Sequence, residues 1–244
     1  MSNITLGILG GLGPMSGVLF CEMLTNYTKA ETDQQHLNFL LSSRATTPDR
    51  TAFIIGESSD DPVPVMIEEV RKLHRAGADI IVIPCNTAHY FYERVADESP
   101  VPIINIIRET VRYCAHRSYK KVGVLATKGT SDSGAYRSDL EAAGIEYVPC
   151  TAAEQQYISD VIYNNIKRGT MPDKDSFISV VNALYSRGCE AVILGCTELS
   201  ILKKNFQLSE GYVDSLEVLA LCAIRKCGKE PRNLPEPLMN YIPE

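Results

Sequence analysis

The chain has 244 residues, 45% of them hydrophobic and 22% charged, which is the composition of an ordinary soluble globular protein. Its 24 basic and 30 acidic residues give a formal net charge of −6, and the basic residues form no run, which argues against binding to nucleic acid or to a membrane surface. The lack of Trp and an aromatic content of only 7% disfavour an aromatic-lined sugar or nucleobase cleft.

The N-terminal stretch predicts neither a secretory signal nor a membrane span. Its first cation is Lys29, too late for the basic region of a signal peptide, and Pro14 with several glycines interrupts the apolar run that a spanning helix needs. We therefore expect a cytoplasmic protein whose eight cysteines stay reduced. No Cys-x-x-Cys pair occurs and the four histidines are dispersed, so we expect no metal site.

Short β-branched runs alternate with longer amphipathic stretches along the chain. Strands are predicted at 4–9, 37–41, 79–83, 101–104, 121–126 and 191–194. Helices are predicted at 16–29, 65–75, 86–95, 107–116, 133–143, 154–167, 175–187, 198–204 and 216–226. Residues 229–244 hold four prolines and are predicted to form an irregular tail. Strands that end in glycine loops and lead into helices indicate an α/β fold with parallel sheets and crossover helices.

An internal repeat divides the chain into two halves. Residues 6–9 (Leu-Gly-Ile-Leu) match 122–125 (Val-Gly-Val-Leu), and residues 77–87 match 188–198 at nearly the same offset. Two matches at one offset indicate a duplicated α/β unit. We expect two pseudo-symmetric domains, each a mostly parallel sheet flanked by helices, at residues 1–105 together with 210–244 and at residues 106–209.

Cys85 and Cys196 occupy equivalent places in the two repeats. Each ends a predicted buried strand and is followed at once by small polar residues and a helix. Parallel sheets bind ligands at the carboxyl ends of their strands, and the start of a helix favours a thiolate. A single cysteine is usually a core residue, but the duplication weakens that interpretation for these two. Halves that face each other would place the two thiols on opposite sides of one cleft.

Two thiols across one cleft suit racemisation, which needs a base on one face of a carbon and an acid on the other. A thiol with a pKa near ~8.5 can serve as either with little tuning. No lysine lies in a clear pyridoxal-phosphate context, so we expect no cofactor. N–H groups and cations around the substrate carboxylate would then have to stabilise the carbanion.

Four motifs resemble those of the aspartate/glutamate racemase superfamily. They are Gly-Ile-Leu-Gly-Gly-Leu-Gly-Pro at 7–14, Pro-Asp-Arg-Thr-Ala at 48–52, Pro-Cys-Asn-Thr-Ala-His at 84–89 and Gly-Cys-Thr-Glu at 195–198. The first two resemble the aspartate racemase branch in particular. Glutamate racemases carry an acid in the first motif and a histidine where Glu198 stands here, so both departures favour aspartate.

The resemblance implies cofactor-independent, two-base racemisation in a cleft between two pseudo-symmetric α/β domains. Because this chain keeps both thiols, the enzyme should act in both directions. By resemblance, Cys85 would take the proton from the D-enantiomer and Cys196 from the L-enantiomer. Enzymes of this superfamily are commonly dimers, so a homodimer is also implied.

An acidic substrate needs cations for its second carboxylate. By resemblance, Arg50 and Lys167 would hold the side-chain carboxylate, and a guanidinium suits this role because it can pair in a bidentate manner. The alternative for either residue is a solvated surface charge. Arg168 is a further alternative to Lys167, because the two are adjacent.

Polar residues beside the two cysteines would complete the substrate site. Asn86, Thr87 and Thr197 would offer donors to the α-carboxylate, a role that is compatible with capping their helices. Glu198 would tune the neighbouring thiol or contact the substrate ammonium, or it would satisfy N–H groups at its own helix start. Gly13 belongs to a loop that we expect at the cleft floor.

Other functions stay open at this point. The loop at 11–16 is a weak match to a dinucleotide fingerprint, which would suit a nicotinamide-dependent oxidoreductase. Cys85 with His89, four residues on, would suit a cysteine hydrolase, although a hydrogen bond from His89 to a neighbour explains that residue better. A non-catalytic amino-acid-binding module is a further class. Within the superfamily, a glutamate or broader-specificity racemase is the alternative.

Overall fold

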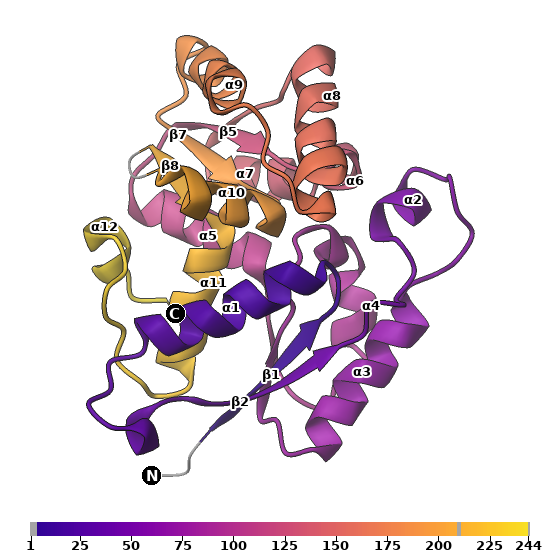
Figure 1. Cartoon of the computed structure of the whole chain (residues 1–244), viewed down its shortest axis with the longest axis vertical. Coiled ribbons are helices and arrows are strands. Elements are labelled where there is room, and N and C mark those ends of the chain that lie inside the picture. The colour runs from indigo at the N-terminus through magenta and orange to yellow at the C-terminus, as the bar shows by residue number, and fades with distance from the viewer. Residues whose placement is uncertain (1–3, 209–210, 244) are drawn as a thin grey trace.

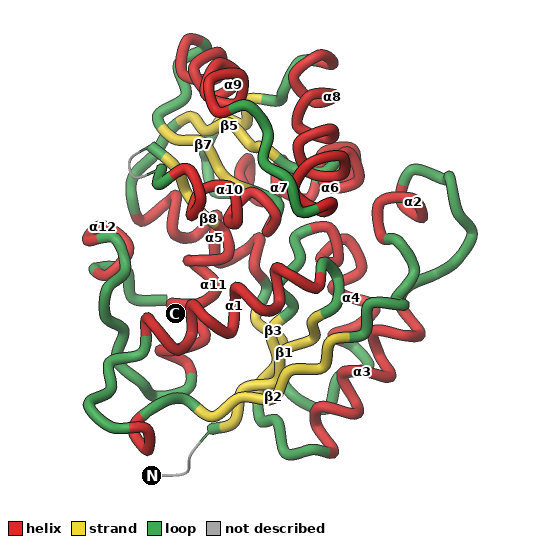
Figure 2. Tube along the Cα trace, in the orientation of Figure 1, coloured by secondary structure: helices red, strands yellow, loops and turns green. Residues whose placement is uncertain are grey.

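Two four-stranded parallel sheets organise the molecule, which the computed structural model describes over residues 4–208 and 211–243. The strand order is β2-β1-β3-β4 in the first sheet and β6-β5-β7-β8 in the second (Figure 1, Figure 2). The strands are β1 (Thr5–Gly10), β2 (Asn38–Ser43), β3 (Ile80–Val82), β4 (Ile103–Ile104), β5 (Lys121–Leu125), β6 (Glu146–Val148), β7 (Ala191–Leu194) and β8 (Tyr212–Asp214). The predicted fold class is confirmed, and the two identical strand orders agree with the internal repeat.

Helices connect successive strands of each sheet. They are α1 (Pro14–Tyr27), α2 (Arg50–Ile54), α3 (Val63–Arg75), α4 (Tyr92–Ala96), α5 (Ile106–His116), α6 (Lys128–Ser133), α7 (Ala135–Ala142), α8 (Ala152–Asp160), α9 (Lys174–Ser186), α10 (Thr197–Phe206), α11 (Ser215–Lys226) and α12 (Glu236–Met239). Shorter turns are η1 (Asp33–Gln35), η2 (Thr87–Phe91), η3 (Val161–Asn165) and η4 (Ile166–Arg168). None of the helices in the described residues is both long enough and apolar enough to cross a lipid bilayer.

A single hydrophobic cluster joins the two sheets. It contains Leu6 and Ile8 of β1 and Val122 and Val124 of β5, with buried residues of α1, α5, α7 and α11. Figure 1 shows α1, α5 and α11 between the strands of the first half and those of the second. Two further clusters place α3 and α4 on the first sheet and α8, α9 and α10 on the second. Because both faces of each sheet are covered, the strands are near-continuous apolar runs.

Helix α11 contributes most to the shared cluster. Apart from Glu217, every residue from Ser215 to Ile224 is buried, and a helix that is apolar nearly all round is one that packs on several sides. Its N-cap, Asp214, accepts two backbone N–H bonds, as Asn105 does at the start of α5. These two helices therefore begin in the same way at equivalent points of the repeat.

Two short strands are present that the sequence did not predict. Strands β6 and β8 have three residues each, too few to show a periodic pattern, and were not predicted. Strand β8 pairs with β7 of the second sheet, whereas the predicted division groups 210–244 with the N-terminal half. The following helix, α11, contacts both α1 and α5. The predicted boundary at 209–210 itself lies outside the described residues.

Several predicted helices are interrupted. The helix expected at 133–143 is α7, which begins only at Ala135 because Gly134 adopts a left-handed φ of 69°. Helix α6, which ends at Ser133, was not predicted. The helix expected at 154–167 is α-helical only to Asp160 and continues as the π-helical turn η3 and the 3-10 turn η4. The helix expected at 86–95 begins as a 3-10 turn, and α2 was not predicted. These interruptions all lie near the carboxyl ends of strands.

The shared cluster predicts a large cost for truncating α11. Leu219 is fully buried, so Leu219→Ala should lower the free energy of unfolding by about 2–5 kcal/mol through lost burial and the cavity left behind. Urea denaturation followed by far-UV circular dichroism would measure this change. Val18→Ala, at a 53% exposed position on α1, is the control and should change it by less than about 0.5 kcal/mol. Equal effects of the two variants would contradict the packing described.

Candidate active site

A cleft is lined by residues of both halves. The first half contributes residues that follow β1, β2 and β3, and the second half contributes residues that follow β5 and β7 and residues of η3 and η4. All predicted site residues except Gly13 line this cleft. Strand ends from both sheets therefore meet where ligands of parallel sheets bind.

The two cysteines lie in matching surroundings. Cys85 and Cys196 are 6% and 5% exposed, and each directly precedes the first turn of a helical segment. Burial raises the pKa of both thiols, while a backbone N–H of the following turn, that of Ala88 or of Glu198, lowers it. The structure thus brings both thiols into one cleft, each beside a helix start.

Charged neighbours make the two thiols unequal. Burial raises the pKa of Cys85, but the nearby Arg50 guanidinium opposes this effect. Burial raises the pKa of Cys196 well above its ordinary value, and the Glu198 carboxylate raises it further. The Cys196 Sγ–H donates to Glu198 Oε2 at 3.0 Å. Cys196 is therefore held as a thiol more firmly than Cys85.

Arg50 is a buried cation with neutral partners. It is 7% exposed, and its guanidinium donates to three backbone carbonyls, those of Leu12 (3.0 Å), Thr47 (3.1 Å) and Pro48 (2.9 Å). Its Nε has no hydrogen-bond partner in the described residues, and no carboxylate there forms an ion pair with it. Asp49 next to it instead caps α2 by accepting from the Ala52 N–H at 2.8 Å. A buried, uncompensated guanidinium favours an anionic ligand.

Three threonine hydroxyls meet across the cleft. Thr87 Oγ1 lies 2.9 Å from both Thr127 Oγ1 and Thr130 Oγ1, which are 3.0 Å apart. Thr127 and Thr130 were not predicted as site residues. The repeat offered a signal for them, since the loop after β5 is equivalent to the glycine loop after β1. Hydroxyls can turn their protons toward a carboxylate, so the trio can serve as a set of donors.

The Asn86 side chain bridges the two halves. Its Nδ2 donates to Ser215 Oγ at 3.0 Å, and its Oδ1 accepts from the Tyr136 hydroxyl at 2.7 Å. Ser215 in turn donates to the carbonyl of Leu194 at the end of β7. One amide hydrogen of Asn86 is thus already used, and the contacts fix the orientation of the side chain beside Cys85.

The π-helical turn η3 places Tyr163 at the cleft, and the following 3-10 turn η4 places Lys167 there. Tyr163 donates from its hydroxyl to Thr51 Oγ1 at 2.9 Å, which joins the second half to the first. Lys167 Nζ lies 4.5 Å from the centroid of the Tyr163 ring and lines the cleft. Lys167 and Arg168 are both exposed, but Arg168 does not line the cleft. Of the two adjacent cations, the structure therefore places Lys167 at the site.

Gly13 and Glu198 fit closely together. A Cβ at Gly13 would lie 2.2 Å from Glu198 Oε1, so a larger residue would displace the carboxylate. Thr197 and Glu198 open α10, and both are buried in the cleft wall. Gly13 itself lines a wider opening that adjoins the cleft and shares Arg50, Lys167 and Glu198 with it. A carboxylate against this loop is the wrong charge for a dinucleotide pyrophosphate.

Both ring nitrogens of His89 contact backbone groups. Its Nδ1 lies 2.8 Å from the carbonyl oxygen of Cys85, and its Nε2 accepts from the Ile106 N–H at 3.2 Å. Burial lowers the pKa of His89 to about 4, so the ring is neutral at pH 7. Both nitrogens are used, and the geometry gives no Cys–His nucleophile pair. In residues 4–208 and 211–243, no three His, Cys, Asp or Glu side chains form a metal-binding group.

Known proteins share this architecture. The sequence model of the Asp/Glu/Hydantoin racemase family matches residues 9–223. The structure of Picrophilus torridus aspartate racemase is similar, with a TM-score of 0.81, 28% identity, and coverage of 98% of this chain and 100% of that one. The broad-specificity amino-acid racemase RacX of Bacillus subtilis is 28% identical over 221 residues, which are 88% of this chain and 94% of that protein.

A glutamate racemase from Aquifex pyrophilus is 31% identical over 177 residues, covering 67% of this chain and 65% of that protein. The family match includes both cysteine motifs and both sheets, and the fold agrees with that of a solved racemase over nearly the whole chain. The resemblance seen in the four motifs is thus confirmed, and the chain belongs to the Asp/Glu/hydantoin racemase family.

Proposed function

We propose that this racemase interconverts the enantiomers of an acidic amino acid, aspartate foremost, without a cofactor and with one cysteine on each face of Cα. The observation that carries the proposal is the buried Arg50 guanidinium, which has only neutral partners in a cleft that also holds Cys85 and Cys196. The similarity to an aspartate racemase structure supports the choice of substrate.

In the proposed reaction, one cysteine thiolate removes the Cα proton and the other thiol donates a proton to the opposite face. The electron pair left on Cα is delocalised into the α-carboxylate. The C–H bond that breaks and the C–H bond that forms are both at Cα, on opposite faces. The hydroxyls of Thr87 and Thr127, which line the cleft, and the N–H groups at the start of α10 would stabilise the charge that develops on that carboxylate. After one turnover the two sulfurs have exchanged protonation states.

The charges in the cleft suit a short dicarboxylate. Arg50 and Lys167 provide two cations for the side-chain carboxylate, and Glu198 provides an anion for the substrate ammonium. A neutral side chain would leave Arg50 buried and unpaired, at a cost of several kcal/mol.

Glutamate is the second candidate. One extra methylene changes binding by only about 1–3 kcal/mol. Space for that methylene exists because the cleft adjoins a wider opening beside Arg50. A broad-specificity relative of similar length agrees with this alternative.

The two-thiol proposal is tested by single substitutions. Cys85→Ala and Cys196→Ala should each lower racemisation of aspartate about 10²–10⁴-fold, since each removes the acid or base on one face. A chiral assay in heavy water would measure both inversion and deuterium incorporation at Cα. Cys21→Ala, on the half-exposed side of α1, is the control and should keep wild-type activity. Two-way activity that survives in either cleft variant would exclude the mechanism.

The role of Arg50 predicts a loss of substrate preference. Arg50→Ala should lower kcat/KM for aspartate by about a hundredfold or more and should affect residual turnover of asparagine much less, because only aspartate offers a second carboxylate. Arg168→Ala removes a nearby exposed cation that does not line the cleft, and kcat/KM should stay unchanged. Normal turnover of aspartate by Arg50→Ala would leave the acidic-substrate proposal without support.

The Glu198–Cys196 contact predicts a pH effect. The Glu198 carboxylate disfavours the Cys196 thiolate, so Glu198→Gln should lower the pKa of this thiol and move its alkylation by iodoacetamide to lower pH. Glu198 also acts on Cys85, but less strongly than burial and Arg50 do. The pKa of Cys85 should therefore fall less than that of Cys196. Mass spectrometry of the alkylated peptides would follow both sites, with Cys150 as an internal reference. An unchanged pH profile for Cys196 would show that Glu198 does not tune it.

A further inference from the structure

The direction of the Arg50 guanidinium depends on two backbone segments. Its Nη2 donates to the carbonyl of Leu12 in the glycine loop after β1, and its Nη1 donates to the carbonyls of Thr47 and Pro48 after β2. No side chain in the described residues holds it. Contacts that fix the positions of these three carbonyls therefore also fix the Arg50 guanidinium in the cleft.

Both segments converge on the backbone of Arg44. The Thr47 Oγ1 and N–H donate to the Arg44 carbonyl at 2.8 Å and 3.3 Å, which closes the turn that carries the Thr47 carbonyl. Gly11, next to Leu12, packs directly on the same residue, since a Cβ there would lie 2.5 Å from the Arg44 backbone N and C atoms. Gly11 also has a φ of 84°, which favours glycine.

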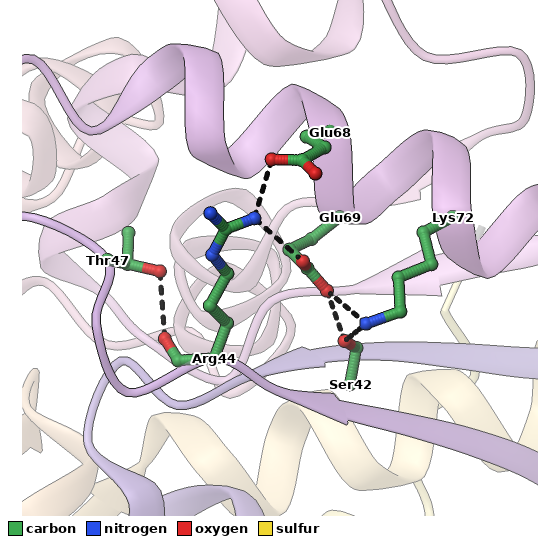
Figure 3. A network of polar contacts seen from close by, with 6 residues as sticks. All are labelled: Ser42, Arg44, Thr47, Glu68, Glu69 and Lys72. Atoms are coloured by element: carbon green, nitrogen blue, oxygen red, sulfur yellow. Dashed lines mark hydrogen bonds and ion pairs between the residues drawn. The ribbon is translucent and has the colours of Figure 1, made fainter.

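The Arg44 side chain is clamped by helix α3. Figure 3 shows its guanidinium between two adjacent carboxylates, with Nη1 2.5 Å from Glu68 Oε2 and 3.1 Å from Glu69 Oε1. The other oxygen of Glu69 accepts from Ser42 at the end of β2 and from Lys72 Nζ at 3.3 Å. The Glu69 side chain is 4% exposed, whereas that of Glu68 is 62% exposed.

Glu69 is the one charged residue on the buried face of α3, whose other buried residues are Val63, Met66, Val70 and Leu73. Burial raises the pKa of Glu69, but hydrogen bonds from Ser42, Arg44 and Lys72 outweigh burial, so its pKa is lowered and it stays ionised at pH 7. An apolar residue would complete this face without the cost of burying a charge. What the carboxylate adds is a fixed direction for Arg44.

We propose that the Arg44–Glu69 ion pair positions the Arg50 guanidinium in the cleft, and that it does so by fixing the Arg44 backbone. The inference rests on the proposed function, because it assigns to Arg50 the substrate's second carboxylate. Neither Arg44 nor Glu69 lines the cleft, so both act through the backbone segments at 11–12 and 44–48. Loosening the pair would let the guanidinium shift while the two thiols keep their places.

The test compares KM and kcat for aspartate in Arg44→Ala, Glu69→Gln and Arg50→Ala. The first two should raise KM about tenfold or more and change kcat less, since misplacing a positioning group by about 1 Å can cost up to ~10²-fold. Arg71→Ala is the matched control, because Arg71 on the same helix pairs with Glu98 at 2.5 Å on the exposed surface. Its KM should equal that of the wild-type chain.

Each outcome decides the inference. A raised KM in Arg44→Ala and Glu69→Gln, with the control unchanged, supports it. Unchanged KM in both, with a raised KM in Arg50→Ala, overturns it and leaves the proposed function intact. An unchanged KM and an unchanged kcat in Arg50→Ala remove the proposed acidic substrate and the inference together. If Arg44→Ala does not fold, the nearly isosteric Glu69→Gln decides alone, with circular dichroism to establish that it is folded.

Discussion

The position of the cleft depends on the hydrophobic cluster that the two sheets share. Because α1, α5 and α11 contribute to one cluster with β1 and β5, the carboxyl ends of strands from both halves are held around the same space. The hydrogen bonds that cross this space join side chains that packing has already placed. A neutral hydrogen bond adds only about 0.5–1.5 kcal/mol, less than the burial of one leucine. The polar contacts therefore set the geometry of the cleft more than its stability.

Within this frame, the distribution of charge follows from how Arg50 is held. Backbone carbonyls accept from its Nη1 and Nη2 atoms without cancelling its charge, whereas a carboxylate partner would accept hydrogen bonds and cancel the charge as well. The one acid beside it, Asp49, is used to cap α2. The acids that hold its surroundings, Glu68 and Glu69, act one step away on Arg44. These acids pair with Arg44 and not with Arg50, so the positive charge of Arg50 stays available in the cleft for a ligand carboxylate.

The sequence was sufficient to predict features that repeat along the chain or that lie at the end of a strand. The placement of Cys85 and Cys196 in one cleft could be predicted because duplication placed the same pattern at two strand ends, and the parallel α/β fold followed from alternating apolar runs. Strands β6 and β8 are too short for such a pattern.

Contacts between distant segments left no local signal. Tyr163 lies on the π-helical turn η3 and contacts Thr51 from there. No residue pattern in the sequence predicts that turn. An acid within the apolar stripe of α3 was visible in the sequence, but its partner Arg44 lies 25 residues away. The role of Glu69 therefore needed the tertiary structure.

Racemisation asks for equivalent chemistry on two faces of one carbon, and the duplicated fold supplies a thiol beside a helix start on each side. The charges around the thiols are not duplicated: Arg50 acts on Cys85, and Glu198, which acts on both thiols, forms a hydrogen bond with Cys196. Arg50 lowers the pKa of Cys85, whereas Glu198 raises that of Cys196. An acidic amino acid would carry a carboxylate to Arg50 and an ammonium to Glu198, and each would neutralise the charge that sets the thiols apart. Under the proposed function, the substrate would therefore reduce the difference between the charges that act on the two thiols.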